Sequence, residues 1–326
     1  MKKADRKIWL IVAVFVISAL MGYLAARLNG NDRDLPDQSI SSSMTADDEE
    51  FGKKIIFDGE EYSLRRDLTT VLFIGTDNGE DETSSTDVGT GPRADVLILF
   101  VIDESEKSIT RINISRDTII PVDVYDRKGA YINTAPMQIN MQYTYGESRL
   151  RSNYLQKKKV GELLYGMKVD EVIALSMDGI APLAELIGGV DLTFEEDMTY
   201  IDSSYLKGET VHLDGKALER IVRYRDTEVS GSNETRMERT GWIITELMKS
   251  VRSSDKKAMA EKILKDDERY ITHDLSAETI KKLMTYSGGE TVSVPGEVKE
   301  GELHDEFHVD DKELKELIIR LFYERA

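Results

Sequence analysis

The chain has 326 residues, of which 40% are hydrophobic and 32% charged, a composition typical of a folded protein with a sizeable core. Its formal net charge of -18 argues against nucleic acid as the main partner, because neutralising phosphates requires a basic face. It contains no cysteine, which excludes disulfides, zinc-thiolate sites and a cysteine nucleophile. An anionic ligand must therefore meet a local basic cluster within an acidic protein.

The first predicted element is a membrane helix. Residues 8–26 carry no charge and approach the roughly 20 residues that cross a bilayer. Lys2 and Lys3 precede this stretch, whereas Asp32 follows it, so the positive-inside rule places residues 1–7 in the cytoplasm. A cleaved signal peptide is the alternative, disfavoured by the long apolar stretch and the poor cleavage site "LAARLNG". We predict a signal anchor in the cell membrane, with the rest of the chain extracellular.

A polar spacer is predicted next, over residues 27–68. It includes the acidic stretch "DQSISSSMTADDEE" and shows no apolar period. As a flexible chain it would span on the order of 30 Å. The folded part would therefore stay close to the outer face of the membrane.

Apolar runs and amphipathic stretches alternate from residue 69 onward. The predicted strands are 70–76, 95–103, 108–115 and 171–177. The predicted helices are 137–146, 149–166, 213–225, 233–251, and three near 256–266, 276–284 and 310–323. Residues 178–194 read as a helix, a double-glycine stop and a strand. This alternation predicts an α/β (mixed α+β) fold, with a single domain over residues 69–326 and a central sheet flanked by helices.

Several kinds of catalytic site have no support in the sequence. There is no G-x-S-x-G elbow, P-loop or Rossmann glycine pattern. The histidines lie in polar stretches that look peripheral, and no metal-ligand spacing repeats on one helix face. No repeat of 20 to 50 residues is visible, which excludes solenoids and propellers.

Arginine and aspartate at strand ends are the remaining candidates. Asp77 directly follows the first predicted strand, and Arg93 and Asp95 stand at the start of the second. Arg116 and Asp117 follow the third. Antiparallel pairing of the first two strands would bring the two carboxylates of Asp77 and Asp95 together. Two carboxylates near arginines suit Mg²⁺ and a pyrophosphate.

A second set of arginines lies on two later helices, and positions three apart in it share a helix face. The set is Arg220, Arg223, Arg225, Arg236 and Arg239. Spacing alone leaves two interpretations open, anion binding and ordinary surface ion pairs. The apolar faces of the same helices are most simply core, although spacing does not distinguish a filled core from one that holds a lipid.

At these residues the chain resembles the LytR-CpsA-Psr family, the membrane-anchored enzymes of Gram-positive cell walls. Over residues 69–250 seven motifs occur in the family's order: "VLFIGTD", "RADVLILFVID", "RINISRDTIIPV", "INMQYTYG", "LSMDGIAPLAELIGGVDLTF", "HLDGKALERIVRYRD" and "ETRMERT". The C-terminal stretch "VSVPGEVKEGELHDEFHVDDKELKELI" also resembles the end of family members.

The resemblance implies a transfer reaction. An anionic glycopolymer, of teichoic acid or capsule type, would pass from a polyprenyl-pyrophosphate carrier to peptidoglycan. Asp77 and Asp95 would serve Mg²⁺, and Arg93, Arg116, Arg223, Arg225 and Arg236 would surround the phosphates. The carrier's lipid would lie in an apolar tunnel between the sheet and the helices.

Departures from the family pattern affect details of this expectation. Ala94 and Val96 flank Asp95 where the family usually has serine and threonine, and "SNETR" replaces its "GDxGR" run. Thr240 stands where the family commonly has a glutamine, which puts one phosphate contact in doubt. The acidic insertion "DNGEDETSSTDVGTG" is long and bears on the choice of acceptor.

The predicted reaction is attack of a peptidoglycan sugar hydroxyl on the anomeric carbon or on the sugar-linked phosphorus. Mg²⁺ and arginines would stabilise the leaving group, with Asp95 or Asp117 as candidate base. A polyprenyl-pyrophosphate phosphohydrolase with water as acceptor is one alternative. A non-catalytic membrane-anchored regulator or binder of wall assembly is another, and it would have little use for the carboxylates of Asp77 and Asp95.

Overall fold

The computed structural model describes residues 54–77, 89, 91–126, 128–224, 232–253, 270–301 and 304–326. Several predictions concern residues outside this part: the membrane helix at 8–26, most of the spacer and of the acidic insertion, Arg225, and the helix near 256–266. Among the described residues, no helix has both the length and the apolarity needed to cross a membrane.

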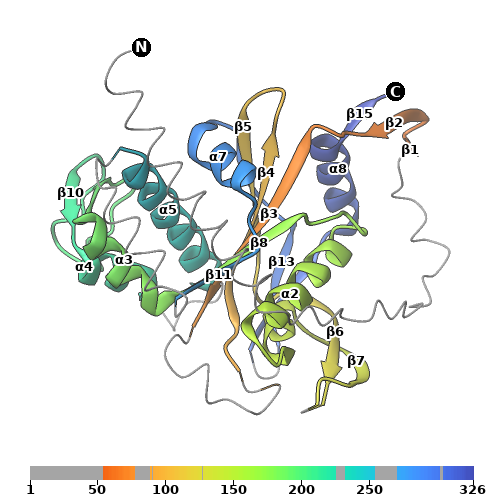
Figure 1. Cartoon of the computed structure of the whole chain (residues 1–326), viewed down its shortest axis with the longest axis horizontal. Coiled ribbons are helices and arrows are strands. Elements are labelled where there is room, and N and C mark those ends of the chain that lie inside the picture. The colour runs from red at the N-terminus through yellow and green to blue at the C-terminus, as the bar shows by residue number, and fades with distance from the viewer. Residues whose placement is uncertain are drawn as a thin grey trace, which may run out of the picture.

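A six-stranded mixed sheet forms the centre of the molecule (Figure 1), with strand order β11-β8-β3-β4-β5-β12. Its bounds are β3 Leu68–Thr76, β4 Ala94–Asp103, β5 Ser108–Ile114, β8 Glu171–Ser176, β11 Ile271–His273 and β12 Thr291–Ser293. The four strands predicted from apolar runs are confirmed within about two residues at either end. Both β3 and β4 are almost wholly buried, as their continuous apolar runs indicated.

The register brings the candidate residues to one end of the sheet. β3 and β4 are antiparallel, with Thr76 opposite Ala94. β3 and β8 are parallel, with Thr76 opposite Ser176. β5 is antiparallel to β4, so it ends where β4 begins. The ends of β3, β5 and β8 and the start of β4 therefore meet at one edge, which we call the site end of the sheet.

Helices cover both faces of the sheet and define two apolar cores (Figure 1). One face carries η2 Ile139–Tyr145, α2 Arg149–Leu163 and α8 Asp311–Phe322. The other carries η3 Met177–Gly179, α3 Ile180–Ile187, α4 Gly215–Arg223, α5 Ser232–Ser253 and α7 Ala277–Thr285. Ile221 and Ile243 are fully buried in this second core, as predicted for the apolar faces of α4 and α5. The fold class predicted from the sequence is confirmed.

Local chemistry explains two of the helix ends. Asp214 precedes α4, and its side chain accepts a hydrogen bond from the backbone N–H of Ala217 at 2.8 Å, which satisfies one free donor of the first turn. The predicted double-glycine stop follows α3, where Gly188 and Gly189 have φ of 75° and 84°. One helix prediction needs correction: within 137–146, a 3₁₀ helix begins only at Ile139, because Met137 and Gln138 still belong to strand β7.

Smaller sheets surround the central one, and most of their strands are not predicted from the sequence. They are the hairpin of β6 Ile119–Tyr125 and β7 Tyr131–Gln138, the pairs β9 Val190–Thr193 with β10 Thr210–Leu213 and β13 Gly296–Glu300 with β14 Asp305–Val309, and a three-stranded sheet of β1 Lys54–Phe57, β2 Glu60–Leu64 and β15 Tyr323–Arg325. These strands are short, and several are exposed on both faces, so they lack a strong apolar alternation.

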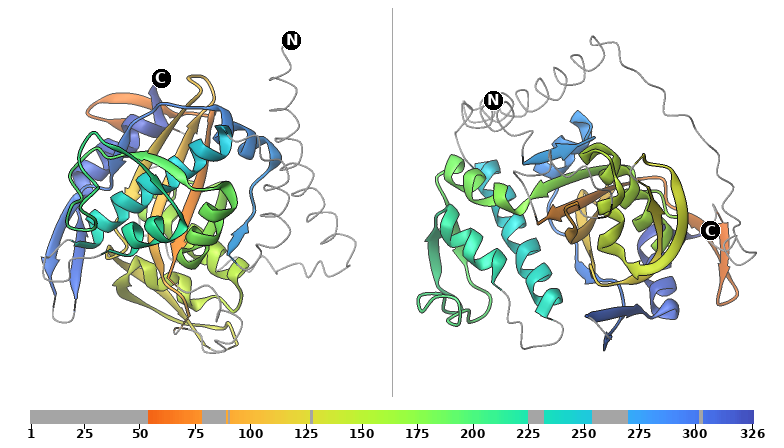
Figure 2. Two further views of the ribbon diagram at one scale, coloured as in Figure 1. Left: turned by 90° about the vertical axis from the view of Figure 1, so that its left-hand side faces the viewer. Right: turned by 90° about the horizontal axis from the view of Figure 1, so that it is seen from below.

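The three-stranded sheet corrects the predicted spacer. Residues 54–68 were assigned to it, but β1 and β2 pair with each other, and β2 pairs with β15 at the other end of the chain (Figure 2). Ile55 is 6% exposed and belongs to the core. The pairing partner lies about 260 residues away, so local sequence polarity alone gave the wrong answer.

Candidate active site

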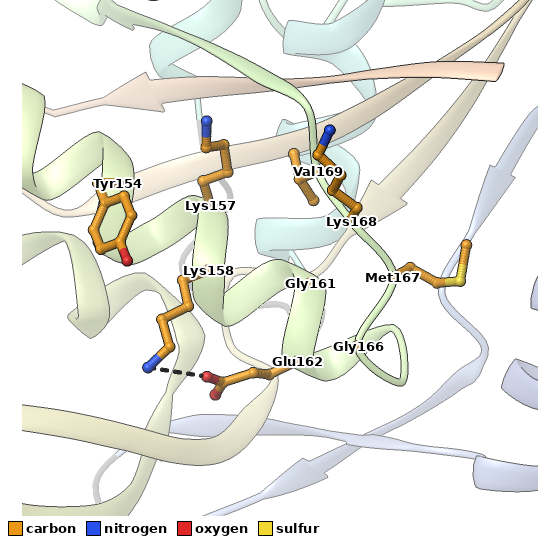
Figure 3. A pocket seen from close by; sticks show the side chains of 9 residues that line it. All are labelled: Tyr154, Lys157, Lys158, Gly161, Glu162, Gly166, Met167, Lys168 and Val169. Carbon is orange, nitrogen blue, oxygen red and sulfur yellow. Dashed lines mark ion pairs between the residues drawn. The ribbon is translucent and has the colours of Figure 1, made fainter. Parts of the chain in front are cut away.

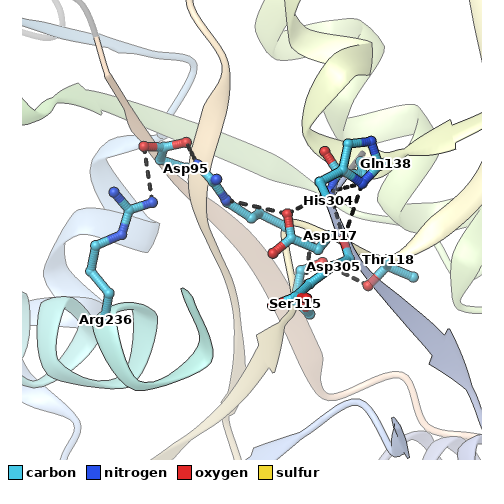
Figure 4. Close-up of polar contacts among 9 residues, drawn as sticks. Asp95, Ser115, Asp117, Thr118, Gln138, Arg236, His304 and Asp305 are labelled. Carbon is cyan, nitrogen blue, oxygen red and sulfur yellow. Dashed lines mark hydrogen bonds and ion pairs between the residues drawn. The ribbon is translucent and has the colours of Figure 1, made fainter. Parts of the chain in front are cut away.

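Two arginines converge on one buried carboxylate at the site end of the sheet (Figure 4). Asp95, the second residue of β4, is 7% exposed. Its Oδ1 accepts a hydrogen bond from Nη1 of Arg116, and its Oδ2 accepts one from Nη2 of Arg236 at 3.0 Å. Side-chain exposure is 17% for each arginine. Residues from three distant parts of the chain thus form one cluster.

A tight turn after β5 fixes Arg116. The backbone N–H of Thr118 donates to the carbonyl of Ser115 at 3.2 Å, and the Thr118 hydroxyl donates to the same carbonyl at 2.6 Å. Because the chain reverses here, Arg116 is held at the end of the strand and reaches Asp95 on the neighbouring strand.

Close packing of α5 on β4 positions Arg236. A Cβ on Gly241 would lie only 2.9 Å from Cδ1 of Ile98, so glycine permits this approach of helix to strand. Arg236 lies five residues earlier on the same helix, toward the start of β4. Thr240, where the family pattern has a glutamine, is fully buried, and its hydroxyl donates to the Arg236 carbonyl at 2.8 Å. That hydroxyl is therefore engaged within the helix.

Asp117 lies behind Arg116, away from solvent. Its side chain is 3% exposed, and its Oδ1 is 3.4 Å from Nε of Arg116. That nitrogen makes no hydrogen bond within the described part of the chain, so the contact is an ion pair only. Nε2 of Gln138 donates to Asp117 Oδ1 at 2.8 Å. The geometry suits Asp117 to orienting Arg116 better than to meeting a substrate.

Gln138 and His304 join this layer, and neither was singled out from the sequence. Nε2 of Gln138 lies 3.3 Å from Nδ1 of His304 and 3.1 Å from the carbonyl of Asp305, at the start of β14 (Figure 4). His304 is exposed, as its polar stretch indicated, yet it contacts the layer behind the site. An isolated glutamine and an isolated histidine carry no sequence signal for such a contact, which only the docking of β13 and β14 against β6 creates.

Asp77 and Arg93 are brought together through the backbone. Oδ1 of Asp77 accepts a hydrogen bond from the backbone N–H of Arg93 at 2.9 Å. The pairing of Thr76 with Ala94 places both residues beside Asp95 along the edge. The guanidinium of Arg93 is exposed and makes no ion pair within the described residues. The predicted antiparallel pairing of the two strands is confirmed, whereas the meeting of the Asp77 and Asp95 carboxylates stays a prediction.

Arg223 reaches the same edge from α4. It forms ion pairs with Asp178, two residues beyond β8, and with Glu219 at 2.8 Å. Partial burial opposes its charge, but Glu219 and Asp178 outweigh burial and hold the pKa of the guanidinium above its ordinary value. Arg223 stays charged at every pH at which the protein is folded.

Two other arginines of the predicted cluster have structural roles instead. Arg220 pairs with Asp202 at 3.2 Å on an exposed surface. Arg239 is 6% exposed, and it donates to the carbonyls of Ile221, at 2.8 Å, and Tyr224 at the end of α4. Helical spacing predicted a shared face for positions 236 and 239, but only Arg236 faces the carboxylate.

The donor set fits a magnesium ion in combination with phosphate. No group of three or more metal-ligating side chains occurs among the described residues. Mg²⁺ typically takes one or two carboxylates and completes its shell with water and substrate phosphate. Asp77 and Asp95 could supply those carboxylates if the guanidiniums of Arg116 and Arg236 turned from Asp95 toward phosphate oxygens.

Comparisons with known proteins agree with this fold. The LytR_cpsA_psr family model matches residues 37–321. The chain is 23% identical over 249 residues to Biofilm regulatory protein A of Streptococcus mutans, covering 72% of this chain and 56% of that protein. It is 22% identical over 218 residues to Polyisoprenyl-teichoic acid--peptidoglycan teichoic acid transferase TagU of Enterococcus faecalis, covering 66% of this chain and 64% of that protein. The chain thus spans about three fifths of the length of these relatives.

Among solved structures, the crystal structure of Bacillus subtilis TagU superposes with a TM-score of 0.60 at 17% identity, covering 78% of this chain and 96% of that one. A likeness at this identity shows the fold alone. The family model, by contrast, covers most of the chain, including every strand that forms the site. The chain belongs to the LytR_cpsA_psr family.

Proposed function

We propose that this protein transfers an anionic glycopolymer from a polyprenyl-pyrophosphate carrier to a hydroxyl of peptidoglycan. The observation that carries the proposal is the convergence of Arg116 and Arg236 on Asp95 at an edge where Arg93 is also available. Family membership and the teichoic acid transferase name of the E. faecalis relative support the substrate class.

The charges of the cluster favour a pyrophosphate ligand. Three guanidiniums, of Arg93, Arg116 and Arg236, lie along the edge with the carboxylates of Asp77 and Asp95. A planar guanidinium fork matches two phosphate oxygens and binds them with charge-assisted hydrogen bonds. The buried carboxylate of Asp95 keeps the two arginines at this edge before the ligand arrives, and they would turn from it to the phosphate oxygens when the ligand binds. Their charge would then stabilise the leaving group.

In the proposed reaction, the acceptor oxygen forms a bond to the sugar-linked phosphorus, and the bond from that phosphorus to the polyprenyl phosphate breaks. Arg116 and Arg236 bind the departing phosphate, and Asp117 holds Arg116 in place. In this proposal Asp95 takes the proton of the acceptor hydroxyl, because Arg116 and Arg236 release its oxygens when they turn to the phosphate, whereas Asp117 is deeper and accepts from Gln138. Mg²⁺ bound by Asp77 and Asp95 would neutralise phosphate charge.

The proposed location follows from the same chemistry. A signal anchor at residues 8–26 would hold the domain at the outer face of the cell membrane, where the lipid carrier resides. Sharing one surface raises the effective concentration of the donor without any new contact.

The test uses the full chain in detergent micelles, with a polyprenyl-pyrophosphate-linked glycopolymer and peptidoglycan fragments, with and without Mg²⁺. The variants are Asp77→Ala, Asp95→Ala and Arg116→Ala, and Arg220→Ala is the matched surface control. We expect polymer-peptidoglycan conjugate from the parent and the control, lost in the three variants and on metal removal. Free polymer phosphate without conjugate would instead identify a hydrolase. Donor binding without turnover would identify a regulator or binder.

A further inference from the structure

One exposed strip of α2 combines basic and aromatic side chains. Leu150, Tyr154 and Lys158 are spaced by four residues and are all exposed, so they share one helix face. Leu150 is 63% and Tyr154 50% exposed, an unusual degree for large apolar side chains. Arg151 and Lys157 flank the strip.

Aromatic rings extend this strip onto the β6-β7 hairpin. The guanidinium of Arg151 lies 5.1 Å from the ring centre of Tyr154 and 5.8 Å from that of Tyr125. Tyr125 in turn meets Tyr131 edge to face at 6.0 Å. Tyr131 is 50% exposed. We refer to the set Tyr125, Tyr131, Arg151, Tyr154, Lys157 and Lys158 as the α2 track.

A pocket of about 310 Å³ lies at the C-terminal part of the track (Figure 3). Tyr154, Lys157 and Lys158 line it on the helix, and Lys168 lines it from the loop before β8. Gly161 is also part of its wall; a Cβ there would lie 2.7 Å from the Met167 carbonyl, so glycine allows the loop to pack against the helix. The pocket is thus bordered by an aromatic ring, several ammonium groups and the carboxylate of Glu162.

The charge of α2 contrasts with that of the whole chain. Residues 148–161 contain five basic residues and no acidic one, in a protein of net charge -18. Lys157 pairs with Asp274 at 2.9 Å, and Lys158 with Glu162 at 3.3 Å. Exposed pairs of this kind contribute little to stability, so an incoming polyanion can compete for the ammonium groups.

The hairpin that carries two tyrosines of the track begins beside the site. Gln138, which pairs with Ile119 at one end of the hairpin, contacts Asp117, and Tyr125 pairs with Tyr131 at the opposite end. α2 follows the hairpin and η2 and leads to the loop before β8. Strand β8 starts at the end of the sheet opposite the site end. The 15 residues of α2 span about 22 Å, at 1.5 Å per residue.

We propose that the α2 track binds the anionic glycopolymer chain itself, beyond its link to the lipid carrier. Sugar rings would pack on the faces of Tyr154 and Tyr131, and the phosphates between them would meet Arg151, Lys157 and Lys158. This proposal rests on the proposed function, since it names a second contact for the same donor. A flat bilayer surface fits less well, because the pocket is concave and its rim is charged.

The test measures binding of lipid-free wall teichoic acid to the full chain in detergent, so no transfer is needed. The variant Arg151→Ala with Lys158→Ala removes two exposed charges, and Lys299→Ala with Lys312→Ala is the charge-matched control elsewhere. We expect Kd to rise about tenfold in the track variant and to stay unchanged in the control. The difference should shrink as salt is added. Tyr154→Ala should weaken binding by about threefold at any salt concentration.

Three results separate this proposal from its alternatives. Equal affinities in the track variant and the control would overturn it, whether or not transfer occurs. Unchanged polymer binding together with lost binding to phosphatidylglycerol vesicles would identify a membrane contact instead. The parent could also show no transfer while only the track variant binds the polymer more weakly. That result would support polymer binding by the α2 track and contradict the proposed transfer reaction. Arg116→Ala should retain lipid-free polymer binding.

Discussion

The two ends of strand β4 both carry an arginine-aspartate cluster, yet the clusters are assembled differently. At the end of the strand, Arg65 pairs with Asp67 and Asp103, each at 2.7 Å, so two carboxylates share one guanidinium. At the start of the strand, Arg116 and Arg236 both pair with Asp95, and Arg116 also lies 3.4 Å from Asp117.

The partners of the two clusters also differ in origin and use. Asp103 accepts backbone N–H groups from Ser105 at 3.0 Å and Glu106 at 2.9 Å, so that cluster closes the β4-β5 turn and satisfies local donors. The Asp95 cluster draws on residues 21 and 141 positions away, so it forms only when separate elements pack together. The Arg65 cluster therefore stabilises a local turn, whereas the Asp95 cluster gathers distant arginines at one edge of the sheet, where they can meet an anion.

The largest difference should appear when the central arginine of each cluster is replaced. Arg116→Met should lower the rate of transfer by about 100-fold or more, because a preorganised charge at the leaving group is lost. Its melting temperature should also fall, because the buried carboxylate of Asp117 loses an ion-pair partner. Arg65→Met should leave transfer unchanged and lower stability. Transfer assays and thermal melts on both variants check this. Equal effects on transfer would contradict the claim that only the Asp95 cluster takes part in the reaction.

Two arginines on α5 allow the same comparison, of a site arginine with a structural one, within one helix. Arg239→Met should destabilise the protein by about 2 to 3 kcal/mol, since the buried carbonyls of Ile221 and Tyr224 lose a charged donor. Arg236→Met should mainly reduce transfer. Urea unfolding and transfer rates measured on both variants check this. If Arg236→Met proved the less stable of the two, the structural role given to Arg239 and the site role given to Arg236 would be contradicted.

Substitutions of Gln138 test whether a residue that contacts Asp117, behind Arg116, affects the transfer rate. Gln138→Leu removes the amide that donates to Asp117 and should cost about 1 kcal/mol of stability. Transfer should fall by about tenfold, through a lower kcat and not a higher KM, because the substrate-binding groups remain. Gln138→Glu, which places a second carboxylate against Asp117, should be worse than the leucine variant. A pure rise in KM would place Gln138 in substrate binding instead.

The smallest expected effect is the acid sensitivity of the structural cluster. The hydrogen bond from Arg65 lowers the pKa of Asp67. At Asp103, burial favours the neutral acid, but the N–H of Glu106 and the guanidinium of Arg65 outweigh it and also lower the pKa. A lowered folded-state pKa stabilises the fold above the ordinary carboxyl pKa of about 4, and this contribution disappears as pH falls through the folded-state value.

Arg65→Met should therefore be less stable than the parent by about 1 kcal/mol at neutral pH, and the gap should close in acid, as pH falls through the lowered pKa values of Asp67 and Asp103. Unfolding measured by circular dichroism at pH 7 and at decreasing pH checks this. A gap that is constant with pH would assign the effect of Arg65 to packing of its side-chain stem.

Long apolar runs and glycine stops were sufficient to predict the central strands and most helices. Strands β3 and β4 are buried on both faces, so their sequences are continuously apolar and easily recognised. The short exposed strands β1, β2, β6 and β7 lack that signal, and so part of the fold was assigned to a spacer. The candidate residues Asp77, Asp95 and Arg116 were found because each stands at the end of a recognisable strand.

The strand-end residues, and the family to which the order of motifs points, can be predicted without a structure. Which arginines converge depends on the fold. Arg236 and Arg239 are three residues apart on α5, and the choice between them depends on how closely Gly241 lets that helix approach Ile98. Gln138 and His304 are brought together by strands far apart in the chain. Contacts of this kind depend on the packing of whole elements, which local propensity and spacing do not encode.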